Sequence, residues 1–160
     1  MAVITGILNT EQVVPSDVFG YEVNTDVGYG RESFAITVGD GVRVGTILEV
    51  DYAAKTATKL AAPADASAVA ALGELAVFVG RDLPTNPSTF QDFERLTMTA
   101  DGVGVAIVKG DGRGVLKKGY LDVSGTQFYK LPDDVQAALV AKFTTENRFK
   151  VLDQQYTPTV

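Results

Sequence analysis

The stretch RESFAITVGDGVRVGTILEVDY, residues 31–52, decides how the chain is expected to fold. Along Phe34–Val38 apolar residues alternate with small or polar ones, which is the period of a half-buried strand. The Gly-Asp-Gly sequence at 39–41 predicts a tight turn, because glycine accepts positive φ at low cost. Arg43 is expected to point outward between two valines, and Gly45–Leu48 begins a second strand that runs to about residue 52. The stretch therefore predicts a β-hairpin.

Short apolar runs bounded by turn residues predict further strands downstream of this hairpin. The predicted strands are the second half of 51–60, then 74–79, 103–108, 115–123 with a break at Gly119, and 148–152. We expect a mainly β (α+β) chain, with a compact β-barrel or sandwich-like domain, one or two small helices and an extended N-terminal arm.

The clearest predicted helix spans residues 131–147. Pro132 suits its first position, Asp133 and Asp134 favour the positive end of the helix dipole, and an apolar stripe follows. The alanine-rich stretch 61–73 predicts a short helical turn capped by Asp65 or Ser67. Residues 89–96 predict another short helix within a proline-rich loop.

Residues 1–30 differ from the rest of the chain. They hold four acidic residues and no basic one, and no helical or strand period lasts beyond a few residues. One interpretation is a loosely held terminus. The other is an arm that adds to the sheet edge of another chain. The candidate contact residues of this arm are Val3, Ile4, Ile7, Leu8, Val13, Val14, Phe19 and Tyr21. The expected division is an arm over 1–30, a β-rich domain over 31–153 and a tail over 154–160.

Composition excludes several kinds of chemistry. The chain has no cysteine and no histidine, so disulfides, thiolate nucleophiles and the commonest general base and metal ligand are absent. The carboxylate pairs Asp92 with Glu94 and Asp133 with Asp134 show no arrangement typical of acid–base catalysis. A sparse calcium site at Asp40 or Asp111 remains an open alternative, although neither lies in an EF-hand pattern. We expect a protein that is not an enzyme and needs no cofactor or metal.

Charge and hydropathy limit the partners. The net charge is −6 and the 14 Lys and Arg residues are scattered, whereas nucleic-acid binding usually needs a basic face. No apolar run approaches the ~20 residues that cross a bilayer, and no basic residue precedes the apolar start as in a secretory signal. We therefore expect no direct nucleic-acid or membrane partner, and synthesis in a cytoplasm.

The order of features over residues 31–152 resembles phage head decoration proteins of the lambda type, also called capsid cement proteins. The Val44–Leu48 step, VGTIL, is similar to the "aGtvL" segment of that family. The other matching features are Arg31-Glu32 before a strand, the turn at 39–41, the alanine-rich stretch 61–72, the strand and turn over 105–110, the helix over 135–143 and the last strand over 149–152. The residues before Arg31 and the long 84–98 loop depart from the family pattern.

This resemblance implies a β-rich subunit without enzymatic activity that binds the outer surface of the expanded phage head. Such proteins form homotrimers at three-fold and quasi-three-fold positions, contact the major capsid protein and hold the shell against internal DNA pressure. Their N-terminal segments often pair with strands of the capsid protein, which favours the arm interpretation. Two alternatives stay open: another structural virion protein, such as a tail or fibre-associated β domain, and a glycan-binding module.

Overall fold

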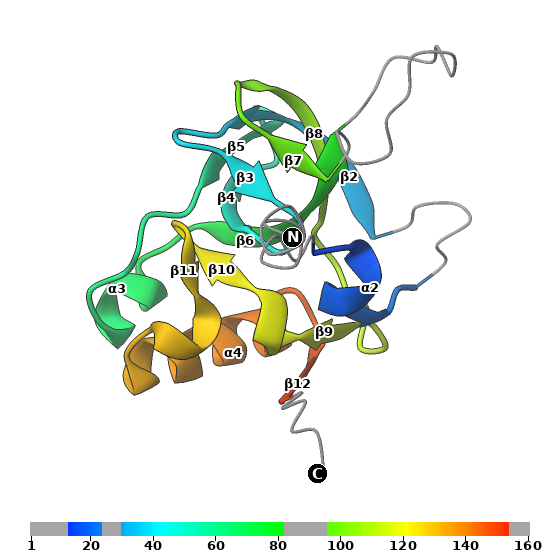
Figure 1. Cartoon of the computed structure of the whole chain (residues 1–160). Coiled ribbons are helices and arrows are strands. Elements are labelled where there is room, and N and C mark those ends of the chain that lie inside the picture. The colour runs from blue at the N-terminus through cyan, green and yellow to red at the C-terminus, as the bar shows by residue number, and fades with distance from the viewer. Residues whose placement is uncertain (1–12, 24–29, 82–95, 154–160) are drawn as a thin grey trace, which may run out of the picture.

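A computed structural model describes residues 13–23, 30–81 and 96–153 of the chain. Its centre is a closed barrel of five strands in the order β2-β5-β4-β6-β8 (Figure 1). Neighbouring strands of this barrel are antiparallel, except that β2 and β5 run parallel. The barrel strands are β2 (Arg31–Thr37), β4 (Ile47–Asp51), β5 (Thr56–Lys59), β6 (Glu74–Arg81) and β8 (Gly102–Ile107). The predicted β-rich α+β class is thus confirmed.

The hairpin predicted over residues 31–52 is wrong. After β2 the chain forms β3 (Val42–Arg43), which pairs with β7 (Thr97–Met98) rather than with β2. β4 pairs with β5 and β6, so that β5 lies between β2 and β4 in the barrel. The turn glycines are present, with positive φ at Gly39 and Gly41, but they connect strands that pair elsewhere.

A second turn at Gly45 redirects the chain from β3 into β4. Its φ is +93°, and a Cβ atom there would lie 2.5 Å from the carbonyl oxygen of Tyr120. The main chain of Gly45 donates to Phe78 O at 3.0 Å and accepts from Asp122 N at 3.1 Å. Because only glycine combines this φ with so close an approach, the VGTIL step is a buried junction between the barrel and the C-terminal half.

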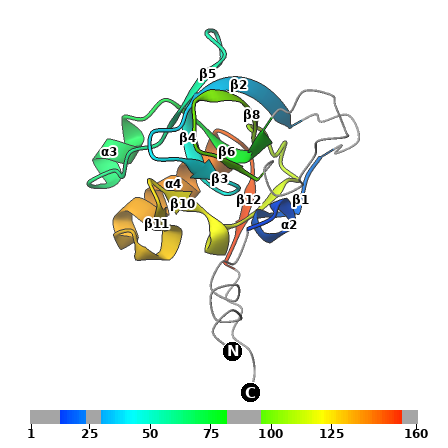
Figure 2. The ribbon, with the colours of Figure 1, turned by 45° about the horizontal axis from the view of Figure 1, so that its top comes forward.

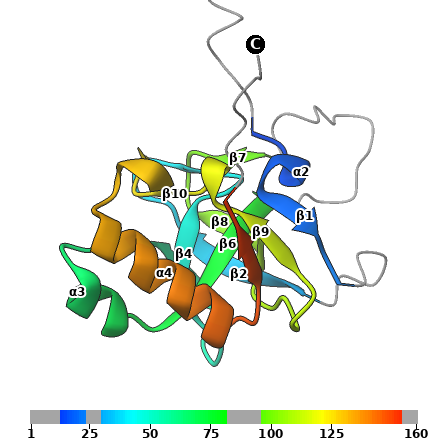
Figure 3. The same cartoon turned by 90° about the horizontal axis from the view of Figure 1, so that it is seen from below.

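Strand β6 is buried on both faces, which explains the uninterrupted apolar run of residues 75–79. Ala76 and Phe78 belong to the cluster that fills the barrel, while Leu75 and Val77 belong to a second cluster on its outside. α4 (Asp133–Thr145) covers this outside cluster with Val135, Leu139 and Phe143, and α3 (Ala66–Ala70) lies beside it (Figure 3).

The helix ends follow the sequence signals closely. Asp65 caps α3 by accepting from the amide of Ala68 at 2.8 Å, as expected. Pro132 is the N-cap of α4 and not its first helical residue, so that prediction was wrong by one position. Because its ψ of 144° is extended, Pro132 lies outside the helix. The helix predicted over residues 89–96 and the tail 154–160 lie outside the described residues, apart from residue 96.

A small sheet of β1 (Phe19–Tyr21), β9 (Val115–Lys117) and β12 (Lys150–Leu152) packs against the barrel, and α2 (Pro15–Val18) precedes β1. Figures 1 and 2 show α2 on the side of the molecule opposite α3. The predicted 115–123 strand does break near Gly119, where η4 intervenes. The remaining elements are η4 (Lys118–Tyr120), β10 (Asp122–Val123), β11 (Thr126–Gln127) and η5 (Phe128–Lys130).

Candidate protein-binding face

The small sheet has one buried side and one open side. β9 is its central strand, with β1 antiparallel and β12 parallel to it. Phe19 and Val151 are both in register with Leu116 on the buried side. Because strand residues alternate between faces, the other side carries Tyr21, Val115, Lys117, Lys150 and Leu152. We call these five residues the outer face, and Figure 3 shows their three strands side by side.

The outer face combines apolar and cationic groups. Tyr21 is 54% exposed and Leu152 is 39% exposed, which places both among the most exposed large hydrophobic residues that the structure describes. Lys150 is exposed, whereas Lys117 is half-buried and its Nζ donates to Ser16 O at 3.0 Å. Exposed apolar side chains gathered on one face are typical of a protein contact.

A β-bulge at Gly20 sets the direction of Tyr21. Phe19 is in register with Leu116 and Tyr21 with Val115, so two residues of β1 span one step of β9. In a regular strand Phe19 and Tyr21 would point to the same side; the extra residue turns them to opposite sides. A Cβ at Gly20 would lie 2.9 Å from Cγ1 of Val115, so glycine lets the bulge sit close to β9.

Both outer strands of this sheet have a free main-chain edge. Among the strands that the structure describes, β1 and β12 each pair with β9 alone. An unpaired edge offers amide and carbonyl groups to an added strand. The small sheet therefore presents two kinds of contact, side chains on its outer face and main-chain groups at its edges.

The expected arm residues fall into four groups. Phe19 is only 6% exposed and belongs to the core, so its prediction as a partner contact is wrong: it fills space between the small sheet and the barrel. Val13 and Val14 are half-buried, and Val13 packs on the same core. Tyr21 alone is exposed. Val3, Ile4, Ile7 and Leu8 lie outside the described residues.

The boundary between arm and domain therefore moves from the expected residue 31. Val18 and Phe19 are both buried in the main core, and β1 is part of a sheet that also contains the last strand of the domain. Arg31 makes an ion pair with Glu22 at 2.8 Å, so residues on either side of that boundary are joined. Residues 15–21 fold with the domain.

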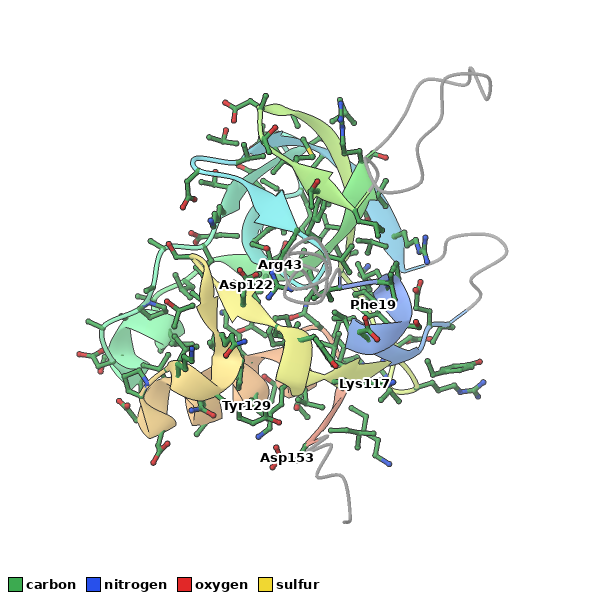
Figure 4. The ribbon with its side chains drawn as sticks, viewed as in Figure 1. Phe19, Arg43, Lys117, Asp122, Tyr129 and Asp153 are labelled. Atoms are coloured by element: carbon green, nitrogen blue, oxygen red, sulfur yellow. The ribbon has the colours of Figure 1, made fainter. Side chains whose placement is uncertain are left out.

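A polar cluster fixes the chain directly after β12. Asp153 accepts from Lys118 Nζ at 3.0 Å and from the Tyr129 hydroxyl at 3.1 Å (labelled in part in Figure 4). The hydrogen bond from Lys118 lowers the pKa of Asp153, and burial together with Asp153 raises the pKa of Tyr129. Lys118 also lies 5.7 Å from the centre of the Tyr129 ring. This cluster holds the end of β12 next to η5.

Arg43 differs from its predicted outward position. It is half-buried, and its Nη1 has no hydrogen-bond partner in the described part of the chain; the same holds for Oδ1 of the buried Asp122. Figure 4 shows these two residues close together between β3 and β10. The alternation of the sequence predicted an exposed Arg43. The prediction is wrong because β3 is only two residues long and pairs with β7, so that neither face of the strand is fully exposed to solvent.

The described carboxylates considered for chemistry have ordinary structural roles. Asp40 pairs with Lys59 and Asp111 with Arg148, which places a cation beside each candidate calcium position. Asp133 and Asp134 occupy the first turn of α4. Within residues 13–23, 30–81 and 96–153 no three acidic side chains are placed to hold a metal ion, and no helix is long and apolar enough to span a membrane. Asp92 and Glu94 lie outside these ranges.

Comparisons of the chain with protein-family models, with curated proteins and with solved structures found no match.

Proposed function

We propose that this chain is a phage head decoration protein that binds the outer surface of the expanded capsid as a trimer at three-fold and quasi-three-fold positions. The observation that carries the proposal is the small sheet, with its exposed outer face and two free edges. In this sheet β1 and the last strand, β12, lie on either side of β9 and next to the closed barrel. The resemblance of residues 31–152 to lambda-type decoration proteins supplies the identity of the partner.

The physical requirements of a cement protein fit these features. A closed barrel has no open edges of its own, and the small sheet is the largest open sheet in the described part of the chain, so we expect strand addition there. Tyr21 and Leu152 supply apolar area, and main-chain groups of β1 and β12 supply directional hydrogen bonds. Three subunits bound together raise apparent affinity by roughly 10²- to 10⁴-fold without any new kind of contact.

The capsid proposal is tested by co-sedimentation of purified protein with expanded and unexpanded heads of its phage. We expect binding to expanded heads and none to unexpanded ones. Equal binding to both forms, or to neither, would contradict the proposal. Binding to isolated tails or fibres instead would favour the alternative of a tail-associated domain.

The role of the outer face is tested with the double substitution Tyr21→Ser and Leu152→Ser. Removing two exposed apolar contacts is expected to weaken binding to expanded heads at least about tenfold. Val103→Ser is the matched control, because Val103 is 51% exposed on barrel strand β8, outside the small sheet. If the control weakens binding as much as the double substitution, the outer face is not the contact.

A further inference from the structure

The outer face of the small sheet carries positive charge that no carboxylate balances. Lys117 and Lys150 are its two charged residues, and neither forms an ion pair within the described part of the chain. Lys150 is exposed, and the Lys117 ammonium donates to a main-chain oxygen, that of Ser16. A chain with a net charge of −6 therefore presents two uncompensated cations on this face.

The carboxylates that directly follow β1 and β12 are held by other side chains. Glu22 accepts from Nε and Nη2 of Arg31, both at 2.8 Å. Asp153 accepts from Lys118 at 3.0 Å and from Tyr129 at 3.1 Å. Because these two acidic groups already have partners, the charge of the outer face remains for a partner of opposite sign.

The strand register mixes the two lysines with apolar side chains. Tyr21, Val115 and Lys150 are in register across the three strands, and Lys117 and Leu152 form the next row. Apolar side chains thus occupy three of the five positions of the outer face. A partner that fits this face needs both apolar and negatively charged groups.

Gly20 lets the Lys117 side chain lie across β1. A Cβ built at Gly20 would lie 3.4 Å from Lys117 Cε and 2.9 Å from Val115 Cγ1, so both side chains rest on the bare main chain of the bulge. The Lys117 ammonium reaches Ser16 in α2, and Figure 4 shows this lysine below that helix. Lys150 begins from β12, at the other edge of the sheet. The two cations are therefore directed to different sides of the apolar residues.

We propose that the outer face binds an extended segment of a partner protein in which acidic, apolar and acidic residues occupy every second position. Alternate residues of an extended chain share one side, so the two carboxylates lie about 13 Å apart with the apolar side chain between them. The carboxylates pair with Lys117 and Lys150, and the apolar side chain packs on Tyr21 and Leu152. This inference rests on the proposed function, in which the partner is the major capsid protein, and adds the chemistry of the segment that is bound.

The same features favour a polypeptide over a nucleic acid. A nucleic acid binds through many phosphate contacts and needs a broad basic face. The outer face offers two lysines among three apolar residues, on a chain with 20 acidic and 14 basic side chains. An acidic and apolar segment matches this composition, whereas a phosphate backbone does not.

The test is an NMR titration of the full chain with the peptide acetyl-Glu-Thr-Leu-Thr-Glu-amide. We expect saturable amide shifts at Tyr21, Val115 and Leu152. The uncharged peptide acetyl-Gln-Thr-Leu-Thr-Gln-amide, which has nearly the same size, is expected to bind at least about fivefold more weakly. Raising the salt concentration from about 0.05 M to about 0.5 M is expected to reduce this difference, because salt screens exposed charges.

A pair of charge-removing substitutions identifies the residues that bind the carboxylates. The double variant Lys117→Met and Lys150→Met keeps most of both side-chain volumes and is expected to bind the acidic peptide at least about fivefold more weakly. Lys130→Met is the matched control, since Lys130 is an exposed lysine of η5, outside the small sheet, and is expected to change binding less than about twofold. The comparison of the two peptides uses the unaltered chain, so it holds even where the double variant fails to fold.

Four outcomes would overturn the inference. The first is an absence of saturable shifts at the outer face up to about 10 mM acidic peptide, a concentration beyond the range of weak specific binding. The second is equal affinity for the two peptides, or an equal loss in the Lys130→Met control and the double variant. The third is tighter binding of a short DNA duplex at the same residues. The fourth is an oligomer in sedimentation velocity that dissociates in the double variant, which would assign the outer face to a contact between copies.

The co-sedimentation experiment with heads separates this inference from the proposed function. Binding to expanded heads without binding of the acidic peptide would overturn the inference and leave the capsid role in place. Binding of the acidic peptide without binding to heads would contradict the capsid role and support the chemistry of the outer face.

Discussion

A single glycine, Gly45, connects the barrel to the C-terminal half of the chain. Two separate constraints require glycine here: the φ of +93°, and the distance of only 2.5 Å between a Cβ built at this position and Tyr120 O. We expect Gly45→Ala to lower the free energy of unfolding by about 3 kcal/mol, through backbone strain and a displaced main-chain carbonyl. Urea denaturation followed by circular dichroism measures this loss.

A substitution at Gly125 distinguishes the cost of backbone strain from the cost of the close approach to Tyr120. It also has positive φ, +81°, but nothing lies within 4 Å of a Cβ built there. Gly125→Ala is therefore expected to cost only the strain of a left-handed alanine, about 1 kcal/mol. Equal losses in the two variants would show that the approach to Tyr120 contributes nothing to the stability of the junction.

Strand β1 gives a test of how the N-terminal part joins the fold. Phe19 is buried against the core and Tyr21 faces outward, although only Gly20 separates them. We expect Phe19→Ala to lower the free energy of unfolding by about 3 kcal/mol, as for other buried aromatic residues. Tyr21→Ser is expected to change it by less than about 0.5 kcal/mol. Similar losses for both would mean that the bulge does not direct them to opposite sides.

Periodicity predicted where strands lie but not which strands pair. The alternation along Phe34–Val38 is a local property, and it identified β2 correctly. Its partners, β5 and β8, are set by barrel closure, which pairs residues as far apart in sequence as Arg31 and Ile107. The local turn at 39–41 therefore could not reveal that the chain does not return along β2.

The candidate site was predictable only in part, for the same physical reason. Tyr21 and Phe19 are both apolar residues of a segment without strand or helix periodicity, so the sequence predicts the same role for both. Phe19 is buried and Tyr21 is exposed because of the bulge at Gly20, and this bulge forms only when β1 pairs with β9. The glycine between these two aromatic residues is the one feature of the sequence that indicates a bulge here.

On the scale of the whole molecule, charge is unevenly distributed along the chain. Residues 109–150 hold eight of the 14 Lys and Arg residues but only five of the 20 acidic ones, and they include β9 and the start of β12. Strand β9 and the start of β12 thus belong to the most basic part of the sequence, which favours an acidic partner surface at the outer face.

The position of the arm boundary leads to a prediction about truncations. Deleting residues 1–12 removes no residue of the described core, whereas deleting residues 1–21 also removes Val18, Phe19 and all of β1. We expect the shorter deletion to remain folded and to bind expanded heads more weakly, if Val3, Ile4, Ile7 and Leu8 contact the capsid protein. The longer deletion is expected to lower the free energy of unfolding by at least about 3 kcal/mol, because it empties core space and exposes β9. Urea denaturation and co-sedimentation measure the two effects separately. Full-strength binding by the shorter deletion would show that the arm is not a capsid contact, and would leave the small sheet as the binding element.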